Sequence, residues 1–276
     1  MTELSDTAAG PEARPAIAYE GVAFAYGPGA PFIEGLSAAI PAGRITSIVG
    51  PNGCGKSTLV KLAAGLLRPA AGRVVVDGCD TGALSARERA RRLAVLAQSP
   101  RVPPLTVEAL VACGRHPYGG RTGRLGPADR EAVEAALERA GVQRLRRHDL
   151  RRLSGGERQR AYLAMILAQD TDLIVLDEPT TYLDINACHD LMALVRDLNR
   201  REGKTVAMVI HDLDLALRYS DRLVVMERGR VRAQGAVAEV LAADAVGAAF
   251  AMDVCPHKRH RSDGGVEHGY VLYPRS

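Results

Sequence analysis

The fold is set by the run Gly50-Pro51-Asn52-Gly53-Cys54-Gly55-Lys56-Ser57, which fits the pattern G-x-x-x-x-G-K-S. A β-rich run, Arg44 to Val49, precedes it, and apolar residues recur at helical spacing from Thr58 to Leu67. Strand, glycine-rich loop and helix in this order are the context of a phosphate-binding loop. The glycines let backbone N–H groups surround a β-phosphate, Lys56 reaches the β- and γ-phosphate oxygens, and the Ser57 hydroxyl ligates Mg²⁺. A plain turn needs none of these flanks, so the run predicts a bound nucleotide.

Four apolar residues that end in two acids form a second motif, Leu173-Ile174-Val175-Leu176-Asp177-Glu178. The pattern predicts a buried strand that delivers carboxylates at its C-terminal end, where ligands bind to α/β sheets. Asp177 is predicted to hold Mg²⁺ through water, and Glu178 to orient or deprotonate the attacking water. An acidic pair after a strand is otherwise often an ordinary turn, so the catalytic interpretation depends on the phosphate-binding loop.

A third motif is Leu153-Ser154-Gly155-Gly156-Glu157, in which Ser154 and Glu157 have the spacing of a capping box. An ordinary helix cap accounts for these two residues. It does not account for two consecutive glycines, each of which costs about 1 kcal/mol within a helix. Exposed amides at the N-terminus of a helix can bind phosphate, so the motif predicts a second phosphate site.

These three motifs, in this order, resemble those of the ATPase subunits of ABC transporters, in which Leu153 to Glu157 is the signature sequence. The likeness runs from about Ala18 to Gly235. It implies an α/β fold: a P-loop NTPase core of the ABC ATPase type, with a β-rich N-terminal lobe and an inserted α-helical subdomain. It also implies an ATPase that uses ATP and Mg²⁺.

The resemblance assigns further site residues one by one. Tyr26 matches the aromatic residue that stacks on adenine, and the residues from Gly50 to Thr58 bind the nucleotide. Gln98 matches the glutamine that senses Mg²⁺ and the γ-phosphate, so it counts as a catalytic and as a metal residue. His211 matches the switch histidine that contacts the γ-phosphate, although a histidine that caps a strand end would explain this residue taken alone.

The resemblance also implies a dimer. Two copies pair head to tail, and each ATP is held between the P-loop of one copy and Ser154, Gly155 and Gly156 of the other. Asp184 matches the loop that crosses the dimer interface, although Tyr182 stands where many relatives have a smaller residue. Hydrolysis and phosphate release reopen the pair, and the segment from Gln98 to Pro117 transmits this population shift to a transmembrane permease.

The partners implied are therefore a second copy, permease subunits and, indirectly, an extracytoplasmic substrate-binding protein, with the chain peripheral on the cytoplasmic face of the inner membrane. Gly114-Arg115-His116-Pro117, the run from Gln159 to Met165, and Asp177 to Ile185 look like the importer branch for ferric siderophores, haem and cobalamin. We expect a ferric siderophore cargo, with haem or cobalamin as alternatives. The remaining alternatives are a soluble non-transport ABC ATPase, which usually has two cassettes or a coiled-coil insert, and a nucleotide-binding regulator without turnover.

Along the chain we expect a disordered tail over 1–16, one ATPase domain over 17–255 and an extension over 256–276. Strands are predicted at Ile17 to Phe24, Arg73 to Val76, Val206 to Ile210 and Leu223 to Met226, with a helix around Asn186 to Leu198. Strands that alternate with helices imply a parallel sheet. A helical subdomain is expected over about 99–169, with one amphipathic helix stopped by Gly141.

Composition excludes several classes of protein. The net charge is only +4, and the arginine clusters are predicted to be solvated helix faces; with no Trp and three Phe, no nucleic-acid binding is expected. No apolar run approaches the ~20 residues of a membrane span, and the start lacks a signal-peptide core. The five cysteines show no C-x-x-C pair and fit reduced cytosolic thiols. Cys54 is either a small residue that fits its loop or a reactive thiol, and Cys255, His257, His260 and His268 fit a polar tail better than a metal site.

Overall fold

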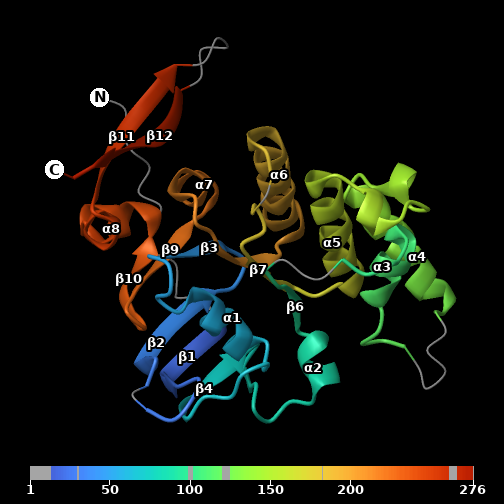
Figure 1. Ribbon diagram of the computed structural model, residues 1–276, viewed down its shortest axis with the longest axis horizontal. Helices are drawn as coiled ribbons and strands as arrows, with labels where there is room; N and C mark the ends of the chain where they lie inside the picture. The colour runs from blue at the N-terminus through green and yellow to red at the C-terminus, as the bar shows by residue number, and fades with distance from the viewer. Residues whose placement is uncertain are drawn as a thin grey trace.

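The computed structural model describes residues 14–29, 31–98, 102–119, 125–181, 183–260 and 266–275, without the side chains of 259, 260 and 266–268. Two sheets, a helical subdomain and a C-terminal hairpin make up this part of the chain (Figure 1). The first strand begins at Pro15, so Pro15 and Ala16 belong to a sheet and not to the expected tail.

The N-terminal lobe is an antiparallel sheet in the strand order β2-β1-β4-β5. Alternating side chains of its strands are buried, as expected for a sheet with one face on the core. The strands are β1 (Pro15–Phe24), β2 (Ile33–Pro41), β4 (Ala71–Val76) and β5 (Cys79–Asp80).

The core sheet has six strands in the order β10-β9-β3-β8-β7-β6. All neighbours pair in parallel except β9 and β10, so the predicted parallel sheet is confirmed. Every residue of β3, β7 and β8 is buried, because both faces of this sheet are covered. The strands are β3 (Ile45–Val49), β6 (Leu93–Leu96), β7 (Leu173–Asp177), β8 (Thr205–Val209), β9 (Arg222–Glu227) and β10 (Arg230–Ala236).

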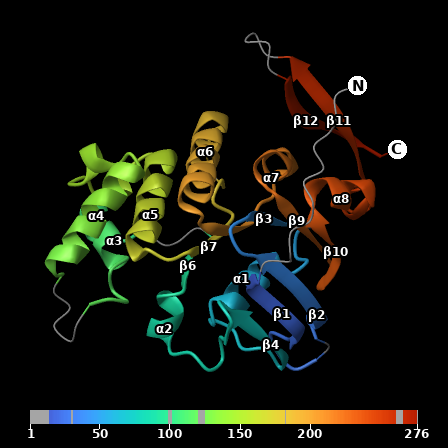
Figure 2. The same ribbon diagram turned by 180° about the vertical axis from the view of Figure 1, so that it is seen from behind.

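Helices cover the two faces of the core sheet differently. Helix α1 packs between the core sheet and the N-terminal lobe, whereas α6 and α7 cover the opposite face (Figures 1 and 2). The helices are α1 (Lys56–Ala63), α2 (Ala86–Ala90), α3 (Val107–Cys113), α4 (Pro127–Arg139), α5 (Gly155–Gln169), α6 (Ile185–Glu202), α7 (Leu213–Tyr219), α8 (Val237–Ala242) and α9 (Ala245–Phe250). In the part of the chain described here, no helix is both long and apolar enough to cross a bilayer.

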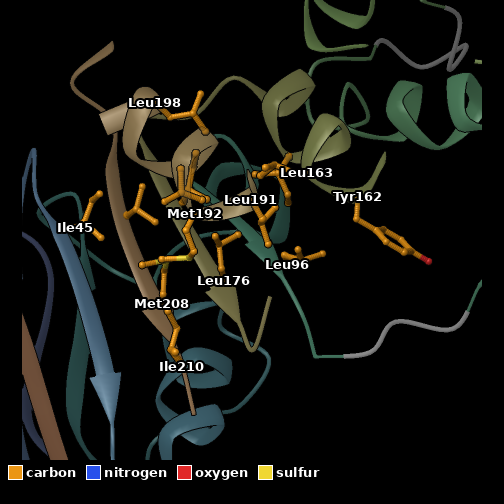
Figure 3. Close-up of a cluster of buried hydrophobic side chains, with 14 of the residues drawn as sticks. Ile45, Leu96, Tyr162, Leu163, Leu176, Leu191, Met192, Leu198, Met208 and Ile210 are labelled. Carbon is orange, nitrogen blue, oxygen red and sulfur yellow. The ribbon is translucent and has the colours of Figure 1, made fainter. Parts of the chain in front are cut away.

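The helical subdomain contains α3, α4, α5 and two short 3₁₀ helices, Gln143–Leu145 and Leu150–Arg152, and it lies to one side of the core sheet (Figure 1). The predicted amphipathic helix is α4, and the chain turns at Gly141 with φ +67°. One continuous apolar cluster joins this subdomain to the sheet: Leu163 of α5, Leu191 and Met192 of α6, and Leu176 of β7 meet there (Figure 3). The subdomain is therefore fixed to the core by packing as well as by chain connections.

Some boundaries differ from those that the sequence predicts. Helix α1 ends at Ala63 and not at Leu67, because Gly65 turns the chain at φ +66° and leaves Leu66 70% exposed. The C-terminal residues form a hairpin of β11 (Met252–His260) and β12 (Val266–Pro274), whereas the sequence predicted only an extension over 256–276. The expected domain boundary after Cys255 falls inside β11.

Candidate functional site

The polar residues singled out by the motifs follow the C-terminal ends of neighbouring parallel strands. The P-loop follows β3, Gln98 follows β6, Asp177 ends β7 with Glu178 directly after it, and His211 follows β8. A cavity of about 480 Å³ opens at this edge. Its lining is Tyr26, Phe32, Asn52, Gly53, Gly55, Lys56, Ser57, Thr58, Gln98, Glu178 and His211.

Two glycines shape the P-loop. A side chain would not fit at the first, and the backbone of the second has a conformation that favours glycine. A Cβ on Gly50 would approach the Met226 carbonyl oxygen to 2.3 Å, and Gly55 begins α1 with φ +109°. The Nζ atom of Lys56, which is 4% exposed, donates to the carbonyl oxygens of Gly50 at 2.7 Å and Pro51 at 3.0 Å. The lysine is therefore folded back onto its own loop, with its charge at the floor of the cavity.

Ser57 and Asp177 form the predicted metal-binding pair. The Ser57 hydroxyl donates to Oδ1 of Asp177 at 3.0 Å. Burial raises the pKa of Asp177, and the hydrogen bond from Ser57 opposes this shift. Hydroxyl and carboxylate oxygens are the ligands that Mg²⁺ prefers, and a cation would relieve the cost of the buried carboxylate, so these residues fit the ion.

Glu178 is the meeting point of the predicted catalytic residues. Its Oε1 atom lies 2.5 Å from Nε2 of His211, and its Oε2 atom accepts a hydrogen bond of 2.6 Å from the side-chain amide of Gln98. Its backbone has φ +53°, and its N–H donates to the Val209 carbonyl at 3.0 Å. The carboxylate is 11% exposed and faces the cavity, which is where a general base needs to be.

Aromatic side chains also border the cavity. Tyr26 is 62% exposed, and its hydroxyl is 2.8 Å from the Thr58 hydroxyl. Its ring lies 4.8 Å from that of Phe24 and 5.6 Å from that of Phe32. An exposed ring of this kind can stack on a nucleobase. The sequence motifs missed Phe32, which stands alone before β2 and belongs to no pattern.

The signature residues lie elsewhere in the chain. Ser154 and Glu157 form the predicted capping box of α5, with the Ser154 N–H donating to Oε2 of Glu157 at 2.9 Å and the Glu157 N–H donating to the Ser154 hydroxyl at 3.3 Å. The hydrogen bonds that the Ser154 N–H and hydroxyl donate to the Glu157 carboxylate lower its pKa. Among the described residues that line the cavity there is none from Leu153 to Glu157. One chain therefore does not bring its signature to its own P-loop.

Asp184 lies close to the signature and not to the P-loop cavity. It caps α6, where its carboxylate accepts a hydrogen bond of 2.8 Å from the Ala187 N–H. A Cβ on Gly156 would lie 3.3 Å from the Ala187 side chain, so this signature glycine packs against the start of α6. Tyr182 and residues 99–101 lie outside the described residues.

The structure bears on the two interpretations of Cys54 and on the choice between a polar tail and a metal site at Cys255. Cys54 is 4% exposed, and its Sγ faces the space beside Gly50. Burial raises the pKa of the thiol, although the charge of Lys56 opposes this shift. Packing rather than reactivity explains this residue. Cys255 is exposed, and no group of three metal-binding side chains occurs among the described residues, which do not include the side chains of His260 and His268.

Comparison with known proteins agrees with this geometry. Residues 33–181 match the family model for ABC transporters. The chain belongs to this family, and its site is that of an ATP-binding ATPase subunit.

Individual relatives indicate which ABC transporter subunits the chain is similar to. The ferric enterobactin transport ATP-binding protein FepC of Escherichia coli is 44% identical over 77% of this chain and 79% of its own length. The iron(3+)-hydroxamate import ATP-binding protein FhuC of Bacillus subtilis is 41% identical over 80% and 82%. The cobalamin import ATP-binding protein BtuD of Halobacterium salinarum is 44% identical over 80% of this chain and 56% of its own. Among solved structures, the dimeric bacterial ABC cassette MJ0796 superposes with a TM-score of 0.72 at 28% identity, over 80% of this chain and 98% of that one.

Proposed function

We propose that this chain is the ATP-hydrolysing subunit of an importer for ferric siderophores, with Glu178 as the base. The observation that carries the catalytic part is the convergence of Gln98 and His211 on the Glu178 carboxylate, beside Lys56 and Ser57 at one cavity. A carboxylate fixed next to a phosphate site can orient or deprotonate a water for attack on the γ-phosphate.

The roles of the other residues follow from their chemistry. Lys56 turns from its loop carbonyls to the β- and γ-phosphates, and Tyr26 stacks on the adenine. Ser57 and Asp177, with Gln98, hold Mg²⁺, which when bound neutralises charge on the phosphates. When ATP binds, Gln98 and His211 turn from the Glu178 carboxylate to the γ-phosphate. Each side chain thereby exchanges a hydrogen bond with Glu178 for one with ATP.

The complete site contains two copies of the chain. The first N–H groups of a helix have no partner inside the helix, and Gly155 and Gly156 are the first residues of α5, away from the P-loop cavity. A head-to-tail second copy supplies the triphosphate that these amides bind. The dimeric cassette MJ0796 supports the pairing of two copies.

The proposed transport role rests on the relatives. The proposed partners are permease subunits in the membrane, with an extracytoplasmic binding protein acting through them, and the chain is peripheral at the cytoplasmic face. FepC and FhuC support an iron chelate as the cargo, and BtuD keeps cobalamin as the second candidate. Uptake of ⁵⁵Fe-siderophore and of labelled cobalamin by proteoliposomes of the co-purified complex separates the two.

The test of the catalytic proposal is Glu178→Gln. Turnover is expected to fall about 10²–10⁴-fold, because the amide cannot accept a proton, while ATP affinity stays within about twofold. Light scattering in Mg-ATP is expected to show a stable dimer. Glu138→Gln, at an exposed site on α4, is the matched control with unchanged turnover. A Glu178→Gln protein that hydrolyses ATP at the wild-type rate removes Glu178 from the role of base.

A further inference from the structure

The Glu178 carboxylate has a third hydrogen-bond donor that no motif predicts. The Thr181 hydroxyl donates to Oε2 of Glu178 at 3.2 Å, the same oxygen that accepts from Gln98. With His211 on Oε1, the carboxylate is held by donors from three separate positions in the chain. Each hydrogen bond to a charged acceptor contributes more than a neutral one, so the third donor is significant.

Thr181 differs from the other two donors in being local. It lies three residues after Glu178, in a turn closed by the Thr181 N–H on the Glu178 carbonyl at 3.3 Å. Gln98 follows β6 and His211 follows β8, so both donors come from segments far from Glu178 in the sequence. The left-handed backbone of Glu178, φ +53°, reverses the chain and brings the threonine over the carboxylate. A β-branched side chain has few rotamers, which keeps the hydroxyl in place.

We propose that Thr181 is a positioning residue that holds the Glu178 carboxylate in its attacking geometry after Gln98 and His211 have turned to the γ-phosphate. The inference rests on the proposed function of Glu178 as the base. A base that lost both outer donors and had no local one would be free to rotate, and its reaction with water would be slower.

The test uses the full chain with three substitutions at one position. Thr181→Val keeps the shape and removes the hydroxyl, Thr181→Ala removes both, and Thr181→Ser keeps the hydroxyl. We expect kcat to fall about tenfold in the valine and alanine proteins, with KM for ATP within about twofold, and to stay within about twofold of wild type in the serine protein. Thermal unfolding of each protein shows whether it folds. If the Thr181→Val protein does not fold, the Thr181→Ala protein takes its place in the comparison.

A second readout does not depend on turnover. In a crystal structure of nucleotide-free Thr181→Val, the Glu178 side chain is expected to adopt more than one rotamer, whereas Thr181→Ser keeps the wild-type one. The proposal is overturned if Thr181→Val and Thr181→Ala both have the wild-type kcat. It is also overturned if kcat falls as far in Thr181→Ser as in Thr181→Val. If Glu178→Gln is inactive while Thr181→Val is fully active, only the role of Thr181 fails. If Glu178→Gln is itself active, the base assignment fails and the Thr181 proposal with it.

Discussion

The P-loop cavity and the signature differ in how their polar groups are satisfied. In the cavity, Lys56 bonds to its own loop and Ser57 to Asp177, so these polar groups have partners before any ligand arrives. At the signature, Ser154 and Glu157 bond to each other, while the first amides of α5 depend on something outside the helix. On the proposed function, the first region binds a nucleotide alone, and the second needs a ligand that another copy brings.

The largest expected effect comes from Ser154→Arg, which fills the space in front of these amides. We expect ATP turnover to fall at least about a hundredfold, on the scale of losing a preorganised anion site, while ATP affinity at the P-loop stays within about twofold. Isothermal titration and a phosphate-release assay measure the two quantities separately.

A matched control for Ser154→Arg exists in the same chain. Ser85 and Glu88 form a second capping box, at the start of α2, so Ser85→Arg breaks the same kind of cap, which contributes about 1 kcal/mol, away from any phosphate site. Its turnover is expected to stay within about twofold of wild type. Loss of ATP binding in Ser154→Arg would remove the division between the two regions.

The next effect concerns the packing that places the signature helix. A Cβ on Gly114, at the end of α3, would meet the Met165 carbonyl of α5 at 2.2 Å. Gly114→Ala is therefore expected to lower the unfolding free energy by about 1–3 kcal/mol in denaturant titrations. Gly119→Ala, where the nearest atom would be 3.6 Å away, is the control with a change below about 0.5 kcal/mol. Equal stability of the two proteins would contradict the close packing of α3 on α5.

The smallest effect is a stabilisation, at Asp177. Because burial raises the pKa of this carboxyl in the folded protein, its ionised form destabilises the fold at neutral pH. The stability that it contributes is complete below the unfolded pKa and is lost as pH rises through the folded pKa. Asp177→Asn is thus expected to raise Tm at pH 7 by a few degrees, about 2–4 °C per kcal/mol of unfolding free energy.

The control for Asp177→Asn is Asp172→Asn, at a fully exposed side chain near the other end of β7. Its Tm is expected to match that of the wild type. A lower Tm for Asp177→Asn than for Asp172→Asn would show that the P-loop cavity carries no cost of this kind.

The sequence predicts the residues that gather at the cavity better than the residues that surround them. Glu178 belongs to a motif, and Gln98 and His211 match family positions, so the sequence could assign all three. In the structure, the side chains of Gln98 and His211 both contact the Glu178 carboxylate. Thr181 and Phe32 could not be assigned, since a hydroxyl beside an acid and a lone aromatic residue carry no pattern. Their roles depend on where a turn and a strand place them.

The missed strands have physical reasons as well. In β2 the buried residues Ile33 and Leu36 are three apart, because Gly35 with φ +62° interrupts the alternation. Strand β6 has only four residues, and β10 at the sheet edge is mostly polar. The family resemblance implied that the signature serves the P-loop of another copy, and within one chain the signature residues described here do not line the P-loop cavity.

The shared site is tested most directly by a crystal structure of the Glu178→Gln protein with Mg-ATP. The predicted result is a pair of copies in which each γ-phosphate lies within hydrogen-bond distance of the P-loop amides of one copy and the Gly155 and Gly156 amides of the other. A γ-phosphate held by the P-loop alone, with no signature glycine of any copy near it, would contradict the account.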